Sequence, residues 1–316
     1  GFATDDPAYP SSIGDVSISA IAVHPSDSKI IYAAFNGGGR DAGKPFLTMS
    51  RDYGRTWAQL REFGEEVMHI SVASEADAVT CVTSAGVSRM SRGKWEDIPA
   101  PKDVSFQYVT VGRTPDAKCV IYATGDSAWQ GDRLRGGLHV STDAGATWKE
   151  SVGGLANLTT AAGRGDPPQF HAVACCATDA RIAYVGFRGL ALADGVFNGI
   201  AKTTDCGATW NIVKKEGTEP SSNAVITWVE PRMRERTWDI WFDPPRDLAV
   251  APTDAGICYA TDLFRTYRTT DGGKMWETVN SVKAGEDKWT TRGLDVTTCY
   301  GVHFDPFDRN HMLISW

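Results

Sequence analysis

The sequence predicts an all-β fold, a β-propeller built from four-stranded antiparallel blades. Three observations support this prediction: a short turn motif that occurs four times, a strand–turn–strand pattern in step with it, and a spacing that leaves room for one blade per repeat. Repeats at such spacings are typical of solenoids and propellers, and four short strands per repeat are typical of a propeller blade.

The recurring turn has the pattern [Ser/Thr]-x-Asp-x-Gly-x-x-Trp. In such a turn the Asp carboxylate accepts hydrogen bonds from backbone N–H groups just downstream, and Gly supplies a positive φ. The Trp that follows is expected to bury its ring under the turn. We therefore interpret four carboxylates as structural, namely Asp52, Asp143, Asp205 and Asp271.

A hairpin pattern accompanies these turns. Alternating and β-branched residues lie on both sides of a Pro or Asp turn, as in residues 20–34, which indicates two antiparallel strands. With the strands that flank each Asp-containing turn, the pattern predicts blades at 15–62, 66–98, 105–152, 168–215 and 246–280, and two strands of a sixth blade after them. The second blade has a degenerate turn at 91–95 that keeps Gly and Trp but lacks the Asp.

This organisation predicts an N-terminal extension at 1–14 and one propeller domain at 15–316. An unfinished blade would leave unpaired strand edges. We therefore expect the chain to be part of a longer polypeptide, with seven or eight blades in the complete propeller.

Composition excludes several classes of partner. The net charge of −7 disfavours nucleic acid and anionic membrane surfaces as ligands, and no apolar run approaches the roughly 20 residues of a membrane span. The six histidines lack the spacing of a zinc site, so we expect no metal and no cofactor. The seven cysteines include no Cys-x-x-Cys pair, and most are interpreted as small buried hydrophobic residues.

The four Asp-containing turns resemble the Asp-box (BNR) repeats of propeller proteins. Such repeats occur in sialidases, in xyloglucan-cleaving glycoside hydrolases, in sortilin-type receptors and in a photosystem II assembly factor. The resemblance covers residues 15–316 and implies a propeller whose Asp-boxes lie on one face, with the ligand site among the loops of the other face.

Residues 257–273 are most similar to the xyloglucanase-type repeat. In one blade of that family the Asp after the second strand is a catalytic carboxylate, and Asp262 occupies the matching place. Hydrolysis of a glycoside needs two carboxylates, one of them an acid. The resemblance therefore implies Asp262 as base or nucleophile, and we assign the acid to Asp295 because it lies near the mouth of a neighbouring blade. The alternative for each of them is an Asp that caps its own loop.

The long loops of the second face combine Trp with Asp and Arg, which is what sugar recognition requires: a ring for stacking and charged groups for the hydroxyls. The candidate binding residues are Trp129, Asp132, Arg133, Arg188, Trp228, Trp238, Trp289 and Arg292. Two alternatives remain open: the tryptophans plug the channel and seal the loops together, or the same face binds a protein.

These patterns lead to one functional hypothesis and one alternative. The hypothesis is a carbohydrate-active propeller, like a glycoside hydrolase, that binds or cleaves a polysaccharide or oligosaccharide. The alternative is a non-catalytic propeller that binds a protein partner. The family resemblance implies an extracellular or periplasmic location.

Overall fold

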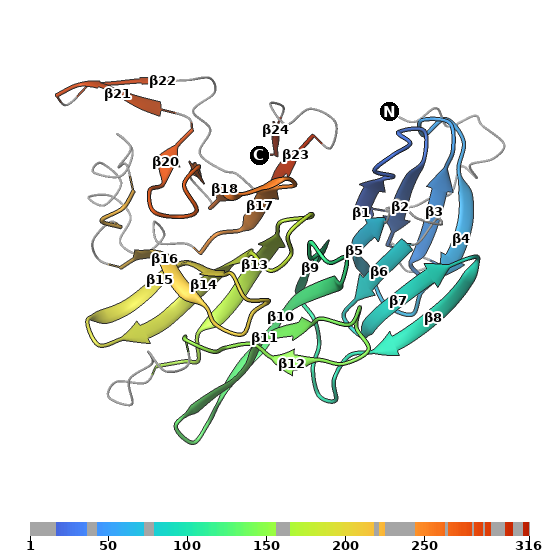
Figure 1. Ribbon diagram of the computed structural model, residues 1–316, viewed down its shortest axis with the longest axis horizontal. Coiled ribbons are helices and arrows are strands. Elements are labelled where there is room, and N and C mark those ends of the chain that lie inside the picture. The colour runs from blue at the N-terminus through green and yellow to red at the C-terminus, as the bar shows by residue number, and fades with distance from the viewer. Residues whose placement is uncertain are drawn as a thin grey trace. The chain divides into compact units, whose positions relative to one another are not determined.

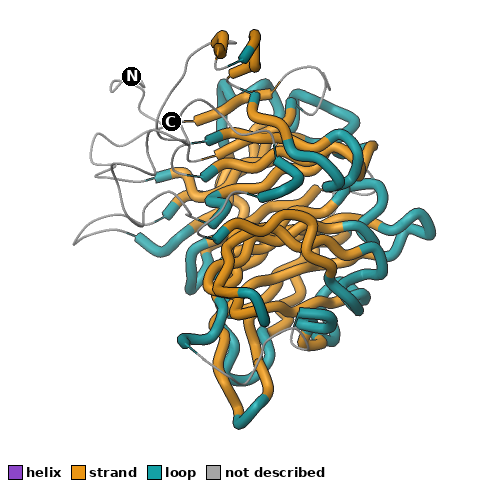
Figure 2. Tube along the Cα trace, turned by 90° about the vertical axis from the view of Figure 1, so that its left-hand side faces the viewer, coloured by secondary structure: helices purple, strands orange, loops and turns teal. Residues whose placement is uncertain are grey.

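The computed structural model describes a chain of β-strands and loops, and no helix occurs among its described residues (Figure 2). The described chain divides into two compact units, Gly1–Pro101 and Lys102–Trp316, and each is considered by itself. The described residues are 17–36, 43–72, 79–155, 165–217, 221–224, 244–262, 265–279, 281–286, 288–291, 301–305 and 312–315.

The first unit contains two four-stranded antiparallel sheets, in which each strand pairs with its neighbour in sequence (Figure 1). Their strands are β1 (Ile18–Val23), β2 (Ile31–Phe35), β3 (Phe46–Ser50) and β4 (Ala58–Glu62), then β5 (Val67–Val72), β6 (Val79–Thr83), β7 (Gly86–Ser91) and β8 (Lys94–Pro99). Apolar side chains from both sheets, such as Tyr32, Leu47, Val67 and Cys81, form one buried cluster between them.

The second unit contains three sheets of the same kind (Figure 1). The first has β9 (Tyr108–Arg113), β10 (Cys119–Gln130), β11 (Arg133–Ser141) and β12 (Lys149–Glu150). The second has β13 (Gln169–Cys175), β14 (Ala183–Leu192), β15 (Gly195–Thr203) and β16 (Asn211–Glu216). The third has β17 (Asp247–Ala251), β18 (Asp254–Thr261), β19 (Thr266–Thr269) and β20 (Glu277–Thr278).

Two further hairpins follow. They are β21 (Ser281–Gly285) with β22 (Lys288–Thr291), and β23 (Gly301–Phe304) with β24 (Met312–Ser315). The second hairpin matches the predicted first two strands of a sixth blade, and the five four-stranded sheets match the five predicted blades within a few residues at each end. The first hairpin was not expected from the sequence.

The degenerate turn of the second sheet is a two-residue hairpin connection. Arg92 and Gly93 have φ values of 51° and 73°. Two consecutive positive φ values match the twist of the flanking strands, so this turn closes the hairpin without the Asp.

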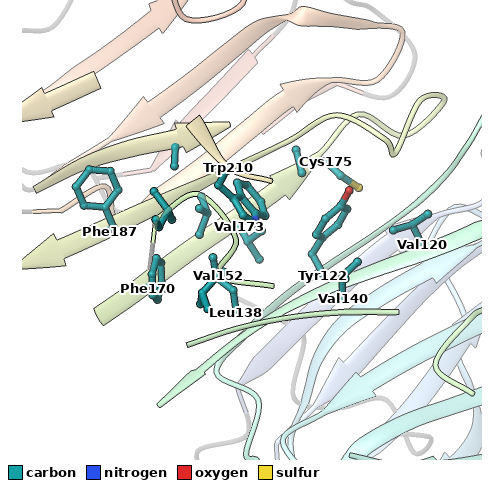
Figure 3. Packing of buried hydrophobic residues seen from close by; sticks show 14 of the residues in the cluster. Val120, Tyr122, Leu138, Val140, Val152, Phe170, Val173, Cys175, Phe187 and Trp210 are labelled. Atoms are coloured by element: carbon teal, nitrogen blue, oxygen red, sulfur yellow. The ribbon is translucent and has the colours of Figure 1, made fainter. Parts of the chain in front are cut away.

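Neighbouring sheets of the second unit are joined through Trp and Tyr side chains. Trp210 follows the Asp-containing turn of one sheet and packs edge-on against Tyr122 of the preceding sheet, with ring centroids 6.1 Å apart. Figure 3 shows Trp210 between Tyr122 and Val173 in this cluster. Trp276 packs in the same way against Tyr184 of the preceding sheet, at 6.5 Å. These two rings therefore fill the space between sheets.

The same tyrosines donate hydrogen bonds across these interfaces. Tyr122 Oη donates to the backbone oxygen of Ala180 at 2.6 Å, and Tyr184 Oη donates to that of Ala255 at 2.8 Å. Ala180 lies in the connection between the first two strands of the following sheet, and Ala255 lies at the start of the second strand of its sheet. Each tyrosine thus fixes its own sheet to the next one.

The structure agrees with the interpretation of most cysteines. Cys81, Cys175, Cys176 and Cys258 are buried as free thiols, while Cys119 and Cys206 are partly buried. Cys299 lies outside the described residues.

Some predictions fall beyond this description. The predicted extension at 1–14 lies outside the described residues, and the assignment of 15–316 to one domain remains a prediction. In the part of the chain that the structure describes, no helix has the length and apolar character to span a membrane.

Candidate functional site

The Asp turns (residues 50–57, 141–148, 203–210 and 269–276) share one hydrogen-bond arrangement. In the second of them, Thr147 donates its N–H to Asp143 Oδ1 at 2.8 Å, and the N–H of Gly145 donates to Ser141 Oγ at 2.7 Å. Ala144 and Gly145 have φ values of 60° and 93°. The turns at Asp52 and Asp205 repeat these bonds, and the turn at Asp271 repeats them with Met275 as the backbone donor. The side-chain oxygens are therefore occupied by the turn itself.

These bonds lower the pKa of the turn carboxylates. The hydroxyl and backbone N–H of Thr56 hold the pKa of Asp52 at about 2, against an ordinary value of 3.8. The pKa values of Asp143, Asp205 and Asp271 are lowered as well. Each turn also lies beside the end of the connection between the first two strands of its sheet, as the bond from Cys206 N to Arg181 O at 3.1 Å shows. The loops between the second and third strands lie at the opposite end of each sheet, which we call the loop end.

Three predicted binding residues lie on one hairpin at the loop end. Trp129 and Arg133 belong to β10 and β11, and Asp132 lies in the turn between these strands. Asp132 and Arg133 are exposed. Trp129 is half-buried against the core and donates its Nε1–H to the backbone oxygen of Gly165 at 3.3 Å. This contact is what we expect from the alternative in which the tryptophans seal the loops together.

The other predicted binding residues are more scattered. Arg188 is an exposed residue of β14, on the neighbouring sheet. Trp289 belongs to β22. The remaining candidates lie outside the described residues: Trp228, Trp238, Arg292 and the predicted acid Asp295.

Asp262 lies directly after β18 and is only 1% exposed. Its Oδ1 accepts a bond from the N–H of Arg265 at 2.7 Å, and its Oδ2 accepts one from Arg265 Nε, also at 2.7 Å. The N–H of Asp262 in turn donates to the backbone oxygen of Arg265 at 3.0 Å. Arg265 therefore holds both oxygens of the carboxylate that the sequence identified as a candidate.

Arg265 also binds a second carboxylate. Its NH2 lies 2.8 Å from Glu216 Oε2 and its NH1 lies 3.2 Å from Glu216 Oε1. Lys214 Nζ lies 2.6 Å from Glu216 Oε1 and 4.6 Å from the centre of the Tyr267 ring. We call Lys214, Glu216, Asp262, Arg265 and Tyr267 the charged cluster, and all five residues are buried.

The charged cluster contains two anions and two cations. Burial opposes ionisation of Glu216, but Arg265 and Lys214 outweigh this effect and hold the pKa of Glu216 well below its usual range. Burial lowers the pKa of Lys214, an effect that Glu216 opposes. The charges are thus mutually compensated, as buried charges require.

A pocket of about 330 Å³ lies at the loop end of the β9–β12 sheet. Its lining consists of Asp103–Ser105, Asp126–Ala128, Arg135–Gly136, His139 and Glu150. Small-molecule sites measure about 300–1,000 Å³, so this volume suits one small ligand group.

Two glycines shape the wall of the pocket. Gly136 and Gly137 have φ values of 69° and 79°, and the register of β10 and β11 shifts between Thr124 and Ser127. A Cβ on Gly136 would lie 2.3 Å from the backbone oxygen of Asp126, and a Cβ on Gly137 would lie 2.5 Å from Ser127 Oγ. The absence of these side chains lets β11 approach β10 closely at the pocket.

The polar groups of the pocket are only partly satisfied. Glu150 accepts bonds from Arg135 NH1 at 2.9 Å and from the N–H of Gly136. Asp126 accepts a bond from Gln107 Nε2 at 2.6 Å. Ser127 Oγ and His139 Nδ1, by contrast, are buried atoms without a hydrogen-bond partner among the described residues. Burial lowers the pKa of His139, although Glu150 opposes the effect, so the imidazole is neutral at neutral pH.

The chain is similar to known proteins in structure but matches none of them by sequence. No protein-family model matches the chain, and no curated protein matches it. The GH74 xyloglucanase from Xanthomonas campestris is similar with a TM-score of 0.58 and 19% identity, over 94% of this chain and 43% of that one. YCF48 bound to D1 peptide is similar with a TM-score of 0.54 and 13% identity, over 95% of this chain and 76% of that one.

These likenesses, together with the four-stranded sheets, decide the fold. The chain has a β-propeller fold. The GH93 α-L-arabinofuranosidase of Fusarium graminearum, in complex with arabinobiose, is a further similar structure, with a TM-score of 0.50 and 12% identity over 93% of this chain and 86% of that one. The chain spans 43% of the length of the GH74 xyloglucanase and of the Niastella koreensis GH74 enzyme that it resembles. Propeller neighbours thus include glycoside hydrolases and a peptide-bound protein.

Several residues of these sites escaped the sequence analysis. His139 and Glu150 lie opposite each other on β11 and β12. This pair could have been predicted from the sequence by counting residues backward and forward from the Asp turn that joins the two strands. Lys214 and Glu216 are two positions apart on β16 and therefore share a face of the strand. Their proximity could also have been predicted from the sequence. Among the described residues, no group of three or more His, Cys, Asp or Glu side chains is arranged so that it could hold a metal ion.

Proposed function

We propose that this chain is a carbohydrate-active propeller that binds or cleaves a polysaccharide or oligosaccharide at the loop end. The observation that carries this proposal is the pocket of about 330 Å³ at the loop end of the β9–β12 sheet. Carboxylates, a guanidinium, a hydroxyl and an imidazole line it, and these groups exchange hydrogen bonds with sugar hydroxyls. The structural likeness to a xyloglucanase and to an arabinofuranosidase complex gives independent support.

The binding surface would extend from the pocket along the long hairpin. Trp129 would offer the exposed part of its ring to a sugar, and Asp132, Arg133 and Arg188 are exposed charged groups for the sugar hydroxyls. Trp228, Trp238, Trp289 and Arg292 would complete the surface from the later loops. An extracellular or periplasmic location, where polysaccharides are met, is part of the same proposal.

In the hydrolytic form of the proposal, Asp262 acts as base or nucleophile and Asp295 as acid. Both oxygens of Asp262 accept bonds from Arg265, so Asp262 can act on a substrate only if Arg265 releases one of them. Binding of a glycan requires no such rearrangement.

The test is to incubate the protein with xyloglucan, arabinan and chitosan, to analyse the products by mass spectrometry, and to repeat the assay with Asp262→Asn. Hydrolysis by Asp262 predicts that cleavage is lost while glycan binding is retained. Asp116→Asn is the matched control, because it removes a carboxylate from an exposed pair with Lys118 in the connection between β9 and β10, away from the loop end. Cleavage that continues unchanged in Asp262→Asn would overturn the catalytic assignment. If the parent protein neither binds nor cleaves any of the three polysaccharides, the proposal as a whole is wrong.

A second candidate function is recognition of a protein segment at the same loop end. The similarity to YCF48 bound to D1 peptide favours it, because the match covers 76% of that chain. A screen of immobilised peptides against the protein distinguishes the two functions. Specific peptide binding without carbohydrate binding would support this candidate and exclude the first.

A further inference from the structure

We propose that the pocket of the β9–β12 sheet selects a ligand with a primary ammonium group, such as the amino group of an amino sugar. This inference rests on the proposed carbohydrate function and narrows its substrate class.

The charge of the pocket is the first argument. Three carboxylates line it, those of Asp103, Asp126 and Glu150, against the single guanidinium of Arg135. Arg135 is already bound to Glu150 at 2.9 Å and to Gln130 Oε1 at 3.2 Å. The charges of Asp103 and Asp126 are therefore left uncompensated within the lining, and the pocket attracts a cation.

The unpartnered atoms are the second and independent argument. His139 is only 7% exposed and packs against Phe106, with ring centroids 6.3 Å apart. Its Nδ1 and the Oγ of Ser127 both lack a hydrogen-bond partner among the described residues, and both side chains line the pocket. A buried polar atom without a partner is costly, so these positions favour a ligand that supplies the missing bonds.

The number and type of these groups suit an ammonium ion. An ammonium has three N–H donors and no acceptor. Asp126 offers a carboxylate, Ser127 Oγ offers a lone pair, and Nδ1 of neutral His139 is an acceptor when the ring proton is on Nε2. These three acceptors lie in one pocket, and the negative charge is supplied by Asp126 with Asp103 beside it.

The size of the pocket limits the rest of the ligand. A volume of about 330 Å³ admits a single sugar ring rather than an extended chain segment. The hydroxyls of such a ring can bind Arg135 and Glu150, which already form a pair at the rim. An N-acetylated sugar loses the charge and adds bulk, so the pocket should discriminate against it.

The experiment is a calorimetric and NMR titration of the full chain with D-glucosamine, D-glucose, N-acetyl-D-glucosamine and cadaverine. We expect glucosamine to bind at least about tenfold more tightly than glucose or N-acetylglucosamine, the difference that one charge-assisted hydrogen bond gives. Asp126→Asn and His139→Gln should each remove this preference. Asp116→Asn should keep the preference, because Asp116 is an exposed carboxylate that pairs with Lys118 in the connection between β9 and β10, outside the pocket.

Each outcome has a distinct meaning. Equal binding of glucose and glucosamine would overturn this inference and leave the proposed carbohydrate function standing. Absence of glucosamine binding would also overturn it, and the polysaccharide assays would then decide the proposed function separately. Binding of cadaverine as tight as that of glucosamine would support ammonium recognition but assign the ligand to a lysine side chain or polyamine.

Discussion

Arg265 NH2 lies 2.8 Å from Glu216 Oε2, although the two residues are 49 positions apart in the sequence. The bond joins β16 of one sheet to the segment after β18 of the next, and both side chains are buried. It makes Glu216 the anion that lies between two cations, Arg265 and Lys214.

Removing the charge of Glu216 should therefore destabilise the protein strongly. Glu216→Gln leaves Arg265 and Lys214 close together with only Asp262 as an anion in the charged cluster. Loss of one partner of a buried ion pair costs about 3–5 kcal/mol, so we expect a large fall in the midpoint of urea unfolding. Asp194→Asn, which breaks the exposed pair with Lys215, should leave the midpoint unchanged. Similar midpoints for the two variants would show that the charged cluster adds no stability.

The Asp turns should make stability depend on pH in the acid range. The pKa of Asp52 is about 2 in the folded state, below its ordinary value of 3.8. A lowered pKa stabilises the folded state fully above pH 3.8, and this contribution disappears as the pH falls from 3.8 towards about 2. The measurement is the carboxyl ¹³C titration of Asp52, combined with unfolding curves for the parent protein and Asp52→Asn at several pH values. The difference in the free energy of unfolding between the parent protein and Asp52→Asn should decrease as the pH falls from 3.8 towards about 2. A measured pKa of 3.8 or above for Asp52 would contradict the prediction.

The hydrogen bonds between sheets can be tested by removing one hydroxyl. Tyr122→Phe deletes the donor that lies 2.6 Å from Ala180 O and leaves this buried oxygen without that bond. We expect a loss of about 1–3 kcal/mol in the free energy of unfolding, the cost of an unsatisfied buried group. Tyr108→Phe is the control, since the Tyr108 side chain is 42% exposed. The prediction fails if urea unfolding places both variants at the same stability.

The buried thiols should be unreactive in the folded protein. Burial raises the pKa values of Cys81 and Cys175 to about 12, so very little thiolate is present at pH 8. Treatment with iodoacetamide at pH 8, followed by peptide mapping, should show these two thiols modified only after denaturation, whereas the partly buried Cys119 reacts earlier. If iodoacetamide modifies Cys175 as fast in the native protein as in urea, burial does not suppress the reactivity of this thiol and the prediction is wrong.

The sequence predicted the sheets well because their determinants are local. The Asp turn fixes where the third strand ends and the fourth begins, and the hydrogen bonds of its Asp and Ser or Thr side chains join residues no more than four positions apart. The hairpin β21–β22 escaped prediction because its segment contains no copy of the Asp turn.

The site was predictable only in part, because it depends on contacts between sheets. The position of Asp262 after the second strand was visible in the sequence, but its bonds to Arg265 and their extension to Glu216 depend on how two sheets pack. The pocket likewise requires the segment at Asp103–Ser105 to lie against β10 and β11, which no local pattern specifies.

The bonds from Tyr122 to Ala180 and from Tyr184 to Ala255 have a consequence for how such a chain can grow. Each bond links a sheet to its immediate successor. The donor lies on the second strand of one sheet, and the acceptor lies just before the second strand of the next sheet (Ala180) or at its start (Ala255). A duplicated gene segment that encodes one whole sheet would carry both the tyrosine that donates this hydrogen bond and the backbone oxygen that accepts it. The copy could then be inserted between existing sheets without new complementary mutations elsewhere, so evolution can lengthen the array one repeat at a time.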